Sequence, residues 1–228
     1  MEFIIEGMQN LPAIINNSDE KFQEEIANNV IRFFELIHLY ESATEVVKTY
    51  LNNLDGEFSL KFQRNPIHNI ESRIKSPESI MGKLQKKGLP VTPESARKNL
   101  MDIGGIRVTC YYISDIYMLA DLLTRRDDFI VLKQKDYIKN PKPSGYRSYH
   151  IIISVPVHLA GYKKQVPVEI QIRTIAMDFW ASLEHQLKYK TNTVITPEIS
   201  AELKKCADNI AETDMRMQKI FMEINGID

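Results

Sequence analysis

The stretch over residues 166–173, Val-Pro-Val-Glu-Ile-Gln-Ile-Arg, constrains the fold of this chain more than any other. From Val168 onward apolar and polar residues alternate strictly, which predicts a β-strand with two different faces. The apolar face consists of Val168, Ile170 and Ile172. The polar face consists of Glu169, Gln171 and Arg173. An acid, an amide and a guanidinium in line form a surface that can hold a ligand, although an ordinary half-solvated strand shows the same alternation.

The size and composition of the chain set the class of protein. Its 228 residues, 43% of them apolar, suffice for one domain with long accessory helices or a small catalytic domain with extensions. No apolar run approaches membrane-spanning length and the N-terminus lacks the pattern of a secretory leader, so we expect a cytoplasmic protein. Cys110 and Cys206 lack paired spacing, and we expect both to be buried, reduced thiols.

The net charge of the chain is only −1, but the charges are unevenly distributed. Residues 1–60 carry eleven acidic against three basic residues, and residues 61–98 carry nine basic against three acidic ones. A second basic cluster, offset only by Asp136, consists of Lys133, Lys135, Lys139, Lys142 and Arg147. Because a general nucleic-acid binder is usually basic overall, local basic patches favour a small polyanion such as a nucleotide; the alternative is solvated loop charge.

Periodicity and capping signals predict alternating helices and strands. The expected helices cover residues 19–54, 76–87, 92–100, 114–125, 174–189 and 197–225, and the expected strands cover 58–62, 67–74, 105–112, 129–131, 147–155 and 166–173. A long polar loop is expected over 133–146, and loops of this length are usually functional. This order predicts an α/β (α+β) domain with a mixed central sheet of about five strands, flanked by helices and by long helices at both ends.

Apolar spacing also predicts the buried face of each long helix. The first helix is acidic and amphipathic, and Asp55-Gly56 is expected to end it. Ser114 and Thr174 are the expected caps of the two later helices. The expected core stripe after Thr174 is Phe179, Leu183 and Leu187, and that of the last helix is Ile199, Leu203, Cys206, Ile210, Met217, Phe221 and Ile224.

The segment Ser76-Pro77-Glu78 has the sequence of a helix N-terminus, with Ser76 as N-cap and Pro77 as first helical residue. The polar side chains that converge there belong to Arg73, Lys75, Ser79 and Lys83. Because exposed N–H groups and the helix dipole already favour anions at such an end, the segment predicts a polyphosphate site. It is not a Walker loop, since Gly82-Lys83-Leu84 lacks the glycine spacing and the Ser or Thr after Lys.

Two separated acids, Asp102 and Glu169, lie at expected strand positions. Nucleotide chemistry uses such a pair because Mg²⁺ takes few carboxylates, keeps waters and bridges phosphate oxygens. Two carboxylates also meet by chance, so the pair alone leaves both interpretations open.

Five ordered motifs resemble those of the RelA/SpoT synthetase domain. They are Arg73-Ile-Lys75-Ser76 with Ser79-Ile80 and Lys83, Asp102-Ile-Gly-Gly-Ile-Arg107, Lys135-Asp-Tyr-Ile, Ser144-Gly-Tyr-Arg-Ser-Tyr-His150 and Glu169-Ile-Gln-Ile-Arg-Thr174. The resemblance covers about residues 67–190, and the short chain is similar to the stand-alone small alarmone synthetases. Its five histidines form no His-Asp metal cluster like that of the hydrolase domain in larger family members.

The resemblance implies a nucleotidyltransferase-like synthetase fold in three parts. These are an N-terminal helical extension over 1–57, a catalytic core over 58–191 and a C-terminal helix over 192–228 that joins subunits. It also implies a reaction, the transfer of the β,γ-pyrophosphate of ATP to the ribose 3′-hydroxyl of GDP or GTP, which gives ppGpp or pppGpp plus AMP.

The resemblance also assigns roles to individual residues. Asp102 and Glu169 would hold Mg²⁺, and Glu169 would help to deprotonate the 3′-hydroxyl. The expected ATP ligands are Arg73 and Arg107, which would sandwich adenine, and Lys75, Ser79, Lys83 and His150, which would hold the phosphates. The expected GDP or GTP ligands are Tyr146, which would stack on guanine, Lys135 and Lys142, which would reach the phosphates, and Asp178, which would bond guanine. Gln171 and Arg173 receive no direct role.

Two other classes of function stay open. A non-catalytic nucleotide-binding or RNA-binding regulator would explain the basic loop but would not need both Asp102 and Glu169. Weak RNA binding is a separate expectation for this chain. A toxin-type relative that modifies adenosine nucleotides or tRNA would have the same donor site.

The terminal helices carry more apolar residues than one contact needs. These residues include Phe33, Phe34, Ile37, Tyr40, Met215, Met217, Phe221 and Ile224. Together with the resemblance they predict a homotetramer joined through the terminal helices; the alternative is that both helices fold wholly onto their own core.

Overall fold

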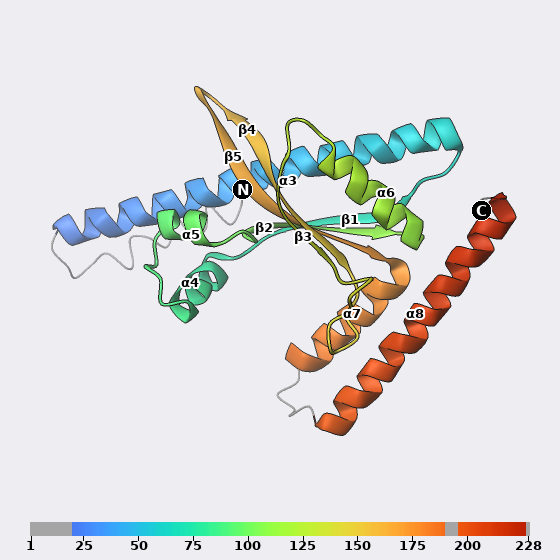
Figure 1. Ribbon diagram of the computed structural model, residues 1–228. Coiled ribbons are helices and arrows are strands. Elements are labelled where there is room, and N and C mark those ends of the chain that lie inside the picture. Colours follow the sequence, from blue (N-terminus) through green and yellow to red (C-terminus); the bar gives the residue numbers. More distant parts are fainter. Residues whose placement is uncertain (1–19, 190–195, 227–228) are drawn as a thin grey trace.

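The computed structural model describes residues 20–189 and 196–226 of the chain (Figure 1). The helices are α3 (Glu20–Phe62), α4 (Pro77–Lys86), α5 (Pro93–Asn99), α6 (Ile113–Thr124), α7 (Ile175–Tyr189) and α8 (Pro197–Asn225). The strands are β1 (Ile67–Ile74), β2 (Gly104–Cys110), β3 (Ile130–Asp136), β4 (Tyr149–Leu159) and β5 (Tyr162–Thr174). Among these residues no helix combines the length and the apolar character needed to cross a membrane.

The strands form one mixed sheet in the order β1-β2-β5-β4-β3. The neighbouring pairs are antiparallel except β2 and β5, which run parallel, with Gly105 opposite Glu169 and Arg107 opposite Gln171. The predicted mixed sheet of about five strands is therefore confirmed. Its middle strand is β5, the strand with the alternating sequence.

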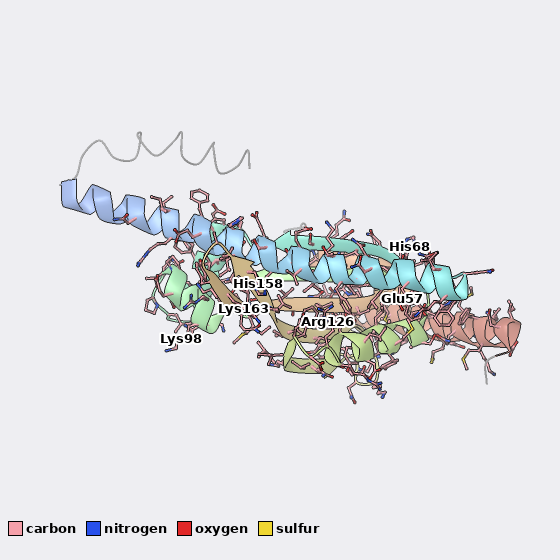
Figure 2. The ribbon with its side chains drawn as sticks, turned by 90° about the horizontal axis from the view of Figure 1, so that it is seen from above. Glu57, His68, Lys98, Arg126, His158 and Lys163 are labelled. Carbon is pink, nitrogen blue, oxygen red and sulfur yellow. The ribbon has the colours of Figure 1, made fainter. Side chains whose placement is uncertain are left out.

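Helices cover the two faces of the sheet differently. Figure 1 shows α3 and α6 on one side of the sheet and α4 and α7 on the other, with α8 alongside α7. Figure 2, from above, shows α3 lying lengthwise over the strands, with Glu57 near one end, His158 near the middle and Lys98 toward the other end. The apolar side chains of β5, such as Ile170, are fully buried in the main core together with those of α3 and α6. The polar side chains of β5 therefore lie on the opposite face of the sheet from α3 and α6.

The long first helix does not end at Asp55-Gly56, and the strand predicted over 58–62 is wrong. Helix α3 continues to Phe62. One glycine in a helix costs only about 1 kcal/mol relative to alanine, and the following turn gains the contact between the rings of Phe58 and Phe62. The carboxylate of Asp55 points to the next strand, where it accepts the backbone N–H of Ile67 at 3.0 Å.

The strands around the long loop are longer than predicted. Strand β3 covers Ile130–Asp136, so Lys133 and Lys135 lie on an edge strand rather than in a loop. The amino-acid pattern concealed this strand because its residues are nearly all exposed. Strands β4 and β5 extend to a turn at Gly161, whose φ of +132° favours glycine. The connection between β3 and β4 is correspondingly shorter, over residues 137–148.

The predicted buried faces of the last two helices need correction. On α7, Phe179, Leu183 and Leu187 are exposed, while Trp180 and Ala181 are buried. The indole Nε1 of Trp180 donates to the carbonyl of Leu203 on α8 at 3.0 Å, which turns this face toward α8. On α8 the buried positions are Ala207 and Asp214, while Ile199, Cys206, Met217 and Ile224 of the predicted stripe are exposed.

Two smaller predictions are also wrong. Helix α6 begins at Ile113 with Tyr112 as N-cap rather than Ser114. The carboxylate of Asp115 accepts the backbone N–H of Tyr112, so an acid in the first turn does the capping. Cys110 is buried as expected, and burial raises the pKa of its thiol, but Cys206 is exposed on α8.

The terminal helices differ in how much apolar surface they expose. On α3, Tyr40 is fully buried, and Phe33 and Ile37 pack against the core. On α8, Met215 and Ile224 remain exposed, at 58% and 78%. Exposed apolar side chains are therefore found on α8 and on the outer face of α7, and on α3 they are Ile31, Leu60 and Phe62 rather than the predicted residues. The predicted boundary after residue 57 falls inside α3, while the region before residue 20 lies outside the described residues.

Candidate active site

A cavity of about 1040 Å³ opens on the polar face of the sheet, where α4 and α7 border it. All five strands contribute side chains to its wall. Nine of the predicted site residues line it, namely Arg73, Lys83, Asp102, Arg107, Lys135, Lys142, Tyr146, His150 and Glu169. The structure therefore brings together residues that are up to about 100 positions apart in the sequence, as one site requires.

Helix α4 and the residues before it supply the cations at one end of the cavity. Ser76 caps the helix as predicted, and its hydroxyl accepts the backbone N–H of Ser79 at 3.3 Å. The ammonium groups of Lys75 and Lys83 both donate to the Asp102 carboxylate, at 2.7 and 2.5 Å. Burial opposes ionisation of Asp102, but the two lysines outweigh it and hold its pKa below the usual range. Asp102 is thus ionised at neutral pH; it lines the cavity together with Lys83, and it also binds Lys75 just behind.

Glu169 occupies the middle strand of the sheet. Its carboxylate lies 3.6 Å from Nδ1 of His150 and accepts the side-chain N–H of Gln171 at 3.1 Å. The neighbouring imidazole of His150 is the main reason why the pKa of Glu169 is lowered, against the opposing effect of burial. An ionised, partly desolvated carboxylate therefore faces the cavity at its centre.

A hydrogen-bonded chain extends from Glu169 toward the loop over residues 137–148. The Tyr146 hydroxyl lies 2.8 Å from Nε2 of His150 and accepts Nη2 of Arg173 at 2.7 Å. Arg173, only 5% exposed, also donates to Asp178 at 3.0 Å and to the side-chain oxygen of Gln171 at 2.7 Å. The buried guanidinium thus fixes the tyrosine, the amide and the acid relative to one another.

A smaller cavity of about 140 Å³ adjoins the first and is lined by Arg73 and Arg107. Gly105 forms part of its wall, and a Cβ at that position would lie 3.7 Å from the side chain of Arg73. The guanidinium of Arg107 pairs with Asp178 at 3.6 Å and with Glu71 at 3.4 Å. Two guanidiniums beside a slot suit a flat aromatic ligand.

The opposite side of the main cavity is basic and aromatic. The ammonium group of Lys142 lies 4.5 Å from the ring centre of Tyr146 and 4.8 Å from that of Tyr137. Lys135 lies 5.6 Å from the ring of Tyr137. An aromatic ring flanked by ammonium groups can hold a base together with its phosphates.

Three predicted residues do not line the cavity. Lys75 acts through Asp102, and Ser79 is exposed at the start of α4. The carboxylate of Asp178 is engaged by Arg173 and Arg107. Its predicted contact with guanine stays a prediction.

The cavity also contains residues to which sequence reasoning gave no role. They are Lys133, Tyr137, Ser144, Ile152, Gln171, Arg173 and, on α7, Ala181, Ser182, Glu184 and His185. Strand alternation had already placed Gln171 and Arg173 on the face of Glu169. The residues of α7 gave no signal because their place at the cavity depends on how the helix docks.

The donor set of the cavity fits Mg²⁺. Within the described residues no group of three or more His, Cys, Asp or Glu side chains could hold a metal by itself. Mg²⁺ keeps several waters and binds through one or two carboxylates plus substrate phosphates. Asp102 and Glu169, both ionised and both on the cavity wall, offer those carboxylates.

Comparisons with known proteins agree on one kind of relative. The family model described as the region found in RelA / SpoT proteins matches residues 72–194. The GTP pyrophosphokinase YwaC of Bacillus subtilis is 42% identical over 82% of this chain and 89% of that protein. A second GTP pyrophosphokinase of the same organism, YjbM, is 35% identical over 81% of this chain and 86% of its own length.

A solved structure matches the fold as well. The small alarmone synthetase 1 from Bacillus subtilis, in a crystal structure with its product pppGpp, aligns with a TM-score of 0.77. The sequences are 33% identical, and the alignment covers 84% of this chain and 97% of that chain.

Proposed function

The chain belongs to the RelA/SpoT family, among its stand-alone small alarmone synthetases, and from this membership we propose how its cavity carries out the reaction. It is a GTP pyrophosphokinase that makes the alarmones ppGpp and pppGpp. The reaction transfers the β,γ-pyrophosphate of ATP to the 3′-hydroxyl of GDP or GTP and releases AMP.

One structural observation carries the assignment of the two substrates. Glu169 lies on the middle strand, most residues predicted to hold the donor are on β1, β2 and α4, and most of those predicted to hold the acceptor are on β3 and the loop between β3 and β4. The exceptions are His150, a predicted donor ligand on β4, and Asp178, a predicted acceptor ligand on α7. A catalytic carboxylate between two nucleotide sites is what a transfer between nucleotides requires. We therefore place ATP over β1 and β2, and GDP or GTP over β4 and β3.

On the donor side, Arg73 and Arg107 would hold adenine in the slot between them. Lys75 and Lys83, which donate to Asp102, would bind the polyphosphate at the N-terminus of α4 together with Ser79. These cations oppose the charge that develops on the transferred pyrophosphate and on the leaving AMP.

On the acceptor side, Tyr146 would stack on guanine while Lys135 and Lys142 bind the acceptor's phosphates. The contact of His150 with both Tyr146 and Glu169 supports a position between the two substrates, next to the transferred phosphates. Binding of guanine nucleotides by these residues is thus supported by their place on one side of Glu169.

In the chemical step, the 3′-oxygen of the acceptor forms a bond to the β-phosphorus of ATP. The bond between that phosphorus and the α,β-bridging oxygen breaks, and the electron pair leaves with AMP. Glu169 accepts the proton of the 3′-hydroxyl, and the ring of His150 holds its carboxylate. A Mg²⁺ ion held by Asp102 and Glu169 would supply charge neutralisation at the phosphate oxygens.

We further propose that the protein acts in the cytoplasm as a homotetramer joined through its terminal helices. The support is the exposed apolar surface of α7 and α8, which includes Phe179 and Met215, both 58% exposed. Weak RNA binding is a lesser proposal and rests on the basic residues of the loop region.

Product identification tests the function. Purified protein is incubated with ATP and Mg²⁺ and, separately, with GDP, GTP, GMP, ADP or tRNA, and products are identified by mass. We expect ppGpp from GDP and pppGpp from GTP, each with one equivalent of AMP. Pyrophosphorylated ADP or tRNA as the main product would point instead to the toxin-type activity, and no product at all to a nucleotide-binding regulator.

A further inference from the structure

Helix α8 touches the acceptor loop directly, although it lies beyond residue 194, where the family match ends. Gly145, in the loop over residues 137–148, is buried against it, and a Cβ built on Gly145 would lie 2.5 Å from the Cβ of Ala207. The φ of Gly145 is +88°, so glycine is required there for its backbone as well as for the space. The loop that carries Tyr146 therefore packs directly against α8.

The side chain of Arg147 connects the same loop to α8 through hydrogen bonds and an ion pair. One guanidinium nitrogen of Arg147, Nη1, donates to the carbonyl of Gly145 at 3.2 Å and to that of Ala207 at 3.3 Å. Its Nη2 lies 3.6 Å from the carboxylate of Asp208. A planar guanidinium can satisfy a loop carbonyl and a helix carbonyl at once, which a flexible ammonium group does less well.

The ring of Tyr146 packs against the small cluster formed by Trp180, Ala181 and Ala207. That cluster is itself held in place, because Trp180 donates to the carbonyl of Leu203. The hydroxyl of Thr174 at the end of β5 also donates to buried Asp214 of α8, at 2.6 Å. The position of Tyr146 is thus set from one side by Arg173 and from the other by α8.

We infer that α8 supports the acceptor site from behind by holding the loop over residues 137–148 in place. Arg147 and Ala207 are then positioning residues for the acceptor nucleotide. This inference rests on the proposed function, since it assumes that Tyr146 binds the acceptor base. Neither residue lines the main cavity, so both act through Gly145 and Tyr146. The donor site, over β1 and β2, does not depend on them.

Kinetics with four variants and a control test this inference. The variants are Arg147→Gln, Gly145→Ala, Ala207→Gly and the double variant Gly145→Ala/Ala207→Gly. The control is Arg216→Gln, an exposed arginine of α8 that pairs with Glu212 of its own helix. For each protein, the KM for GDP, the KM for ATP and kcat are measured.

We expect Arg147→Gln to raise the KM for GDP about tenfold through the lost hydrogen bonds, with the KM for ATP nearly unchanged. Gly145→Ala should raise the KM for GDP further. In the double variant part of that rise should be reversed, because glycine at 207 removes the Cβ that the new methyl group meets. Equal rises for both substrates in Arg147→Gln, or a double variant no better than Gly145→Ala, would overturn the inference.

Hydrogen exchange of the nucleotide-free protein separates this inference from the proposed function. The amides of residues 137–148 should exchange faster in Arg147→Gln than in the wild type and in Arg216→Gln. If the wild type makes no ppGpp but this difference is present, the function is wrong and the contact of α8 with the loop stands. If the wild type is active and the loop exchanges equally in all three proteins, α8 does not position the loop. A globally unfolded Arg147→Gln variant leaves the decision to the Gly145 and Ala207 variants.

Discussion

The hydroxyl of Tyr146 lies 2.8 Å from one ring nitrogen of His150, whose other nitrogen lies 3.6 Å from the carboxylate of Glu169. The imidazole of His150 thus lies between Tyr146, which is proposed to stack on the acceptor base, and Glu169, which is proposed to accept the proton of the acceptor's 3′-hydroxyl. Sequence similarity alone assigned His150 to the phosphates of ATP. The geometry adds a contact with the catalytic carboxylate, and this contact has a consequence for pH dependence.

The variant His150→Ala should move the acid limb of the pH–activity profile to higher pH. His150 is the main cause of the lowered pKa of Glu169, so its removal returns that pKa toward the ordinary value near 4.5. Because Glu169 must be ionised to accept a proton, activity should then be lost at a higher pH as the solution is acidified. Profiles of kcat/KM for the two proteins check this, with circular dichroism at each pH as control. An unshifted acid limb would contradict the role of His150.

Tyr146→Ala and Arg107→Ala should separate acceptor from donor binding. Loss of stacking in Tyr146→Ala should cost about 1–3 kcal/mol of GDP binding and leave the affinity for ATP nearly unchanged. Arg107→Ala should do the reverse. Calorimetric titration with GDP and with a non-hydrolysable ATP analogue measures both affinities. If either folded variant loses both ligands equally, the two nucleotides have been placed wrongly.

Asp214→Asn should make the protein more stable at neutral pH. Burial raises the pKa of Asp214, so in the acidic range the folded state binds more protons than the unfolded state. The free energy of unfolding of the wild type therefore falls as pH rises from the ordinary pKa of an aspartate through the raised one. Asparagine still offers an acceptor for the hydroxyl of Thr174 but does not titrate.

The stability difference between Asp214→Asn and the wild type should accordingly grow with pH across this range and then level off. Urea unfolding at several pH values measures it. As a control, Asp214→Ala removes the acceptor as well and should cost about 1–3 kcal/mol. A stability difference between the asparagine variant and the wild type that does not change with pH would show that Asp214 keeps its ordinary pKa.

The state of assembly should follow from the exposed apolar faces of α7 and α8. Leu183 and Ile224 are 46% and 78% exposed, more than a monomer usually leaves in contact with water on neighbouring helices. Light scattering at micromolar concentration should give four times the chain mass of 26.4 kDa. Leu183→Glu should lower that mass. A wild-type mass of one chain would end the assembly proposal and leave the catalytic one intact.

The parts of the fold that could be predicted are those set by neighbouring residues. Helix α4 begins where Ser76 and Pro77 place it, because a cap needs only its own turn. Strand β5 was predicted because each of its residues has a defined face, and that pattern also placed Gln171 and Arg173 beside Glu169. The motif resemblance supplied nine residues that do share one cavity.

The parts that could not be predicted depend on contacts between distant segments. Helix α3 continues past Gly56, and Asp55, expected to end the helix, instead accepts the backbone N–H of Ile67 on the next strand, which the local sequence does not reveal. Strand β3 has no apolar alternation, since it is an exposed edge strand. Helix α7 has two apolar faces of helical spacing, and only the docking of α8 on Trp180 decides which is buried. The contacts of Arg173 also join distant segments, since its partners include Tyr146 of the loop and Asp178 of α7.

The central claim is that Glu169, at the middle of the sheet, accepts the proton of the acceptor hydroxyl, and single-turnover transfer tests it most directly. Wild type, Glu169→Gln and the control Glu202→Gln, an exposed acid on α8, are mixed with labelled ATP, Mg²⁺ and GDP, and ppGpp is followed in time. We predict that Glu169→Gln keeps its melting temperature but forms ppGpp at least about 100-fold more slowly, while Glu202→Gln matches the wild type. A folded Glu169→Gln protein with near-wild-type transfer would contradict the account.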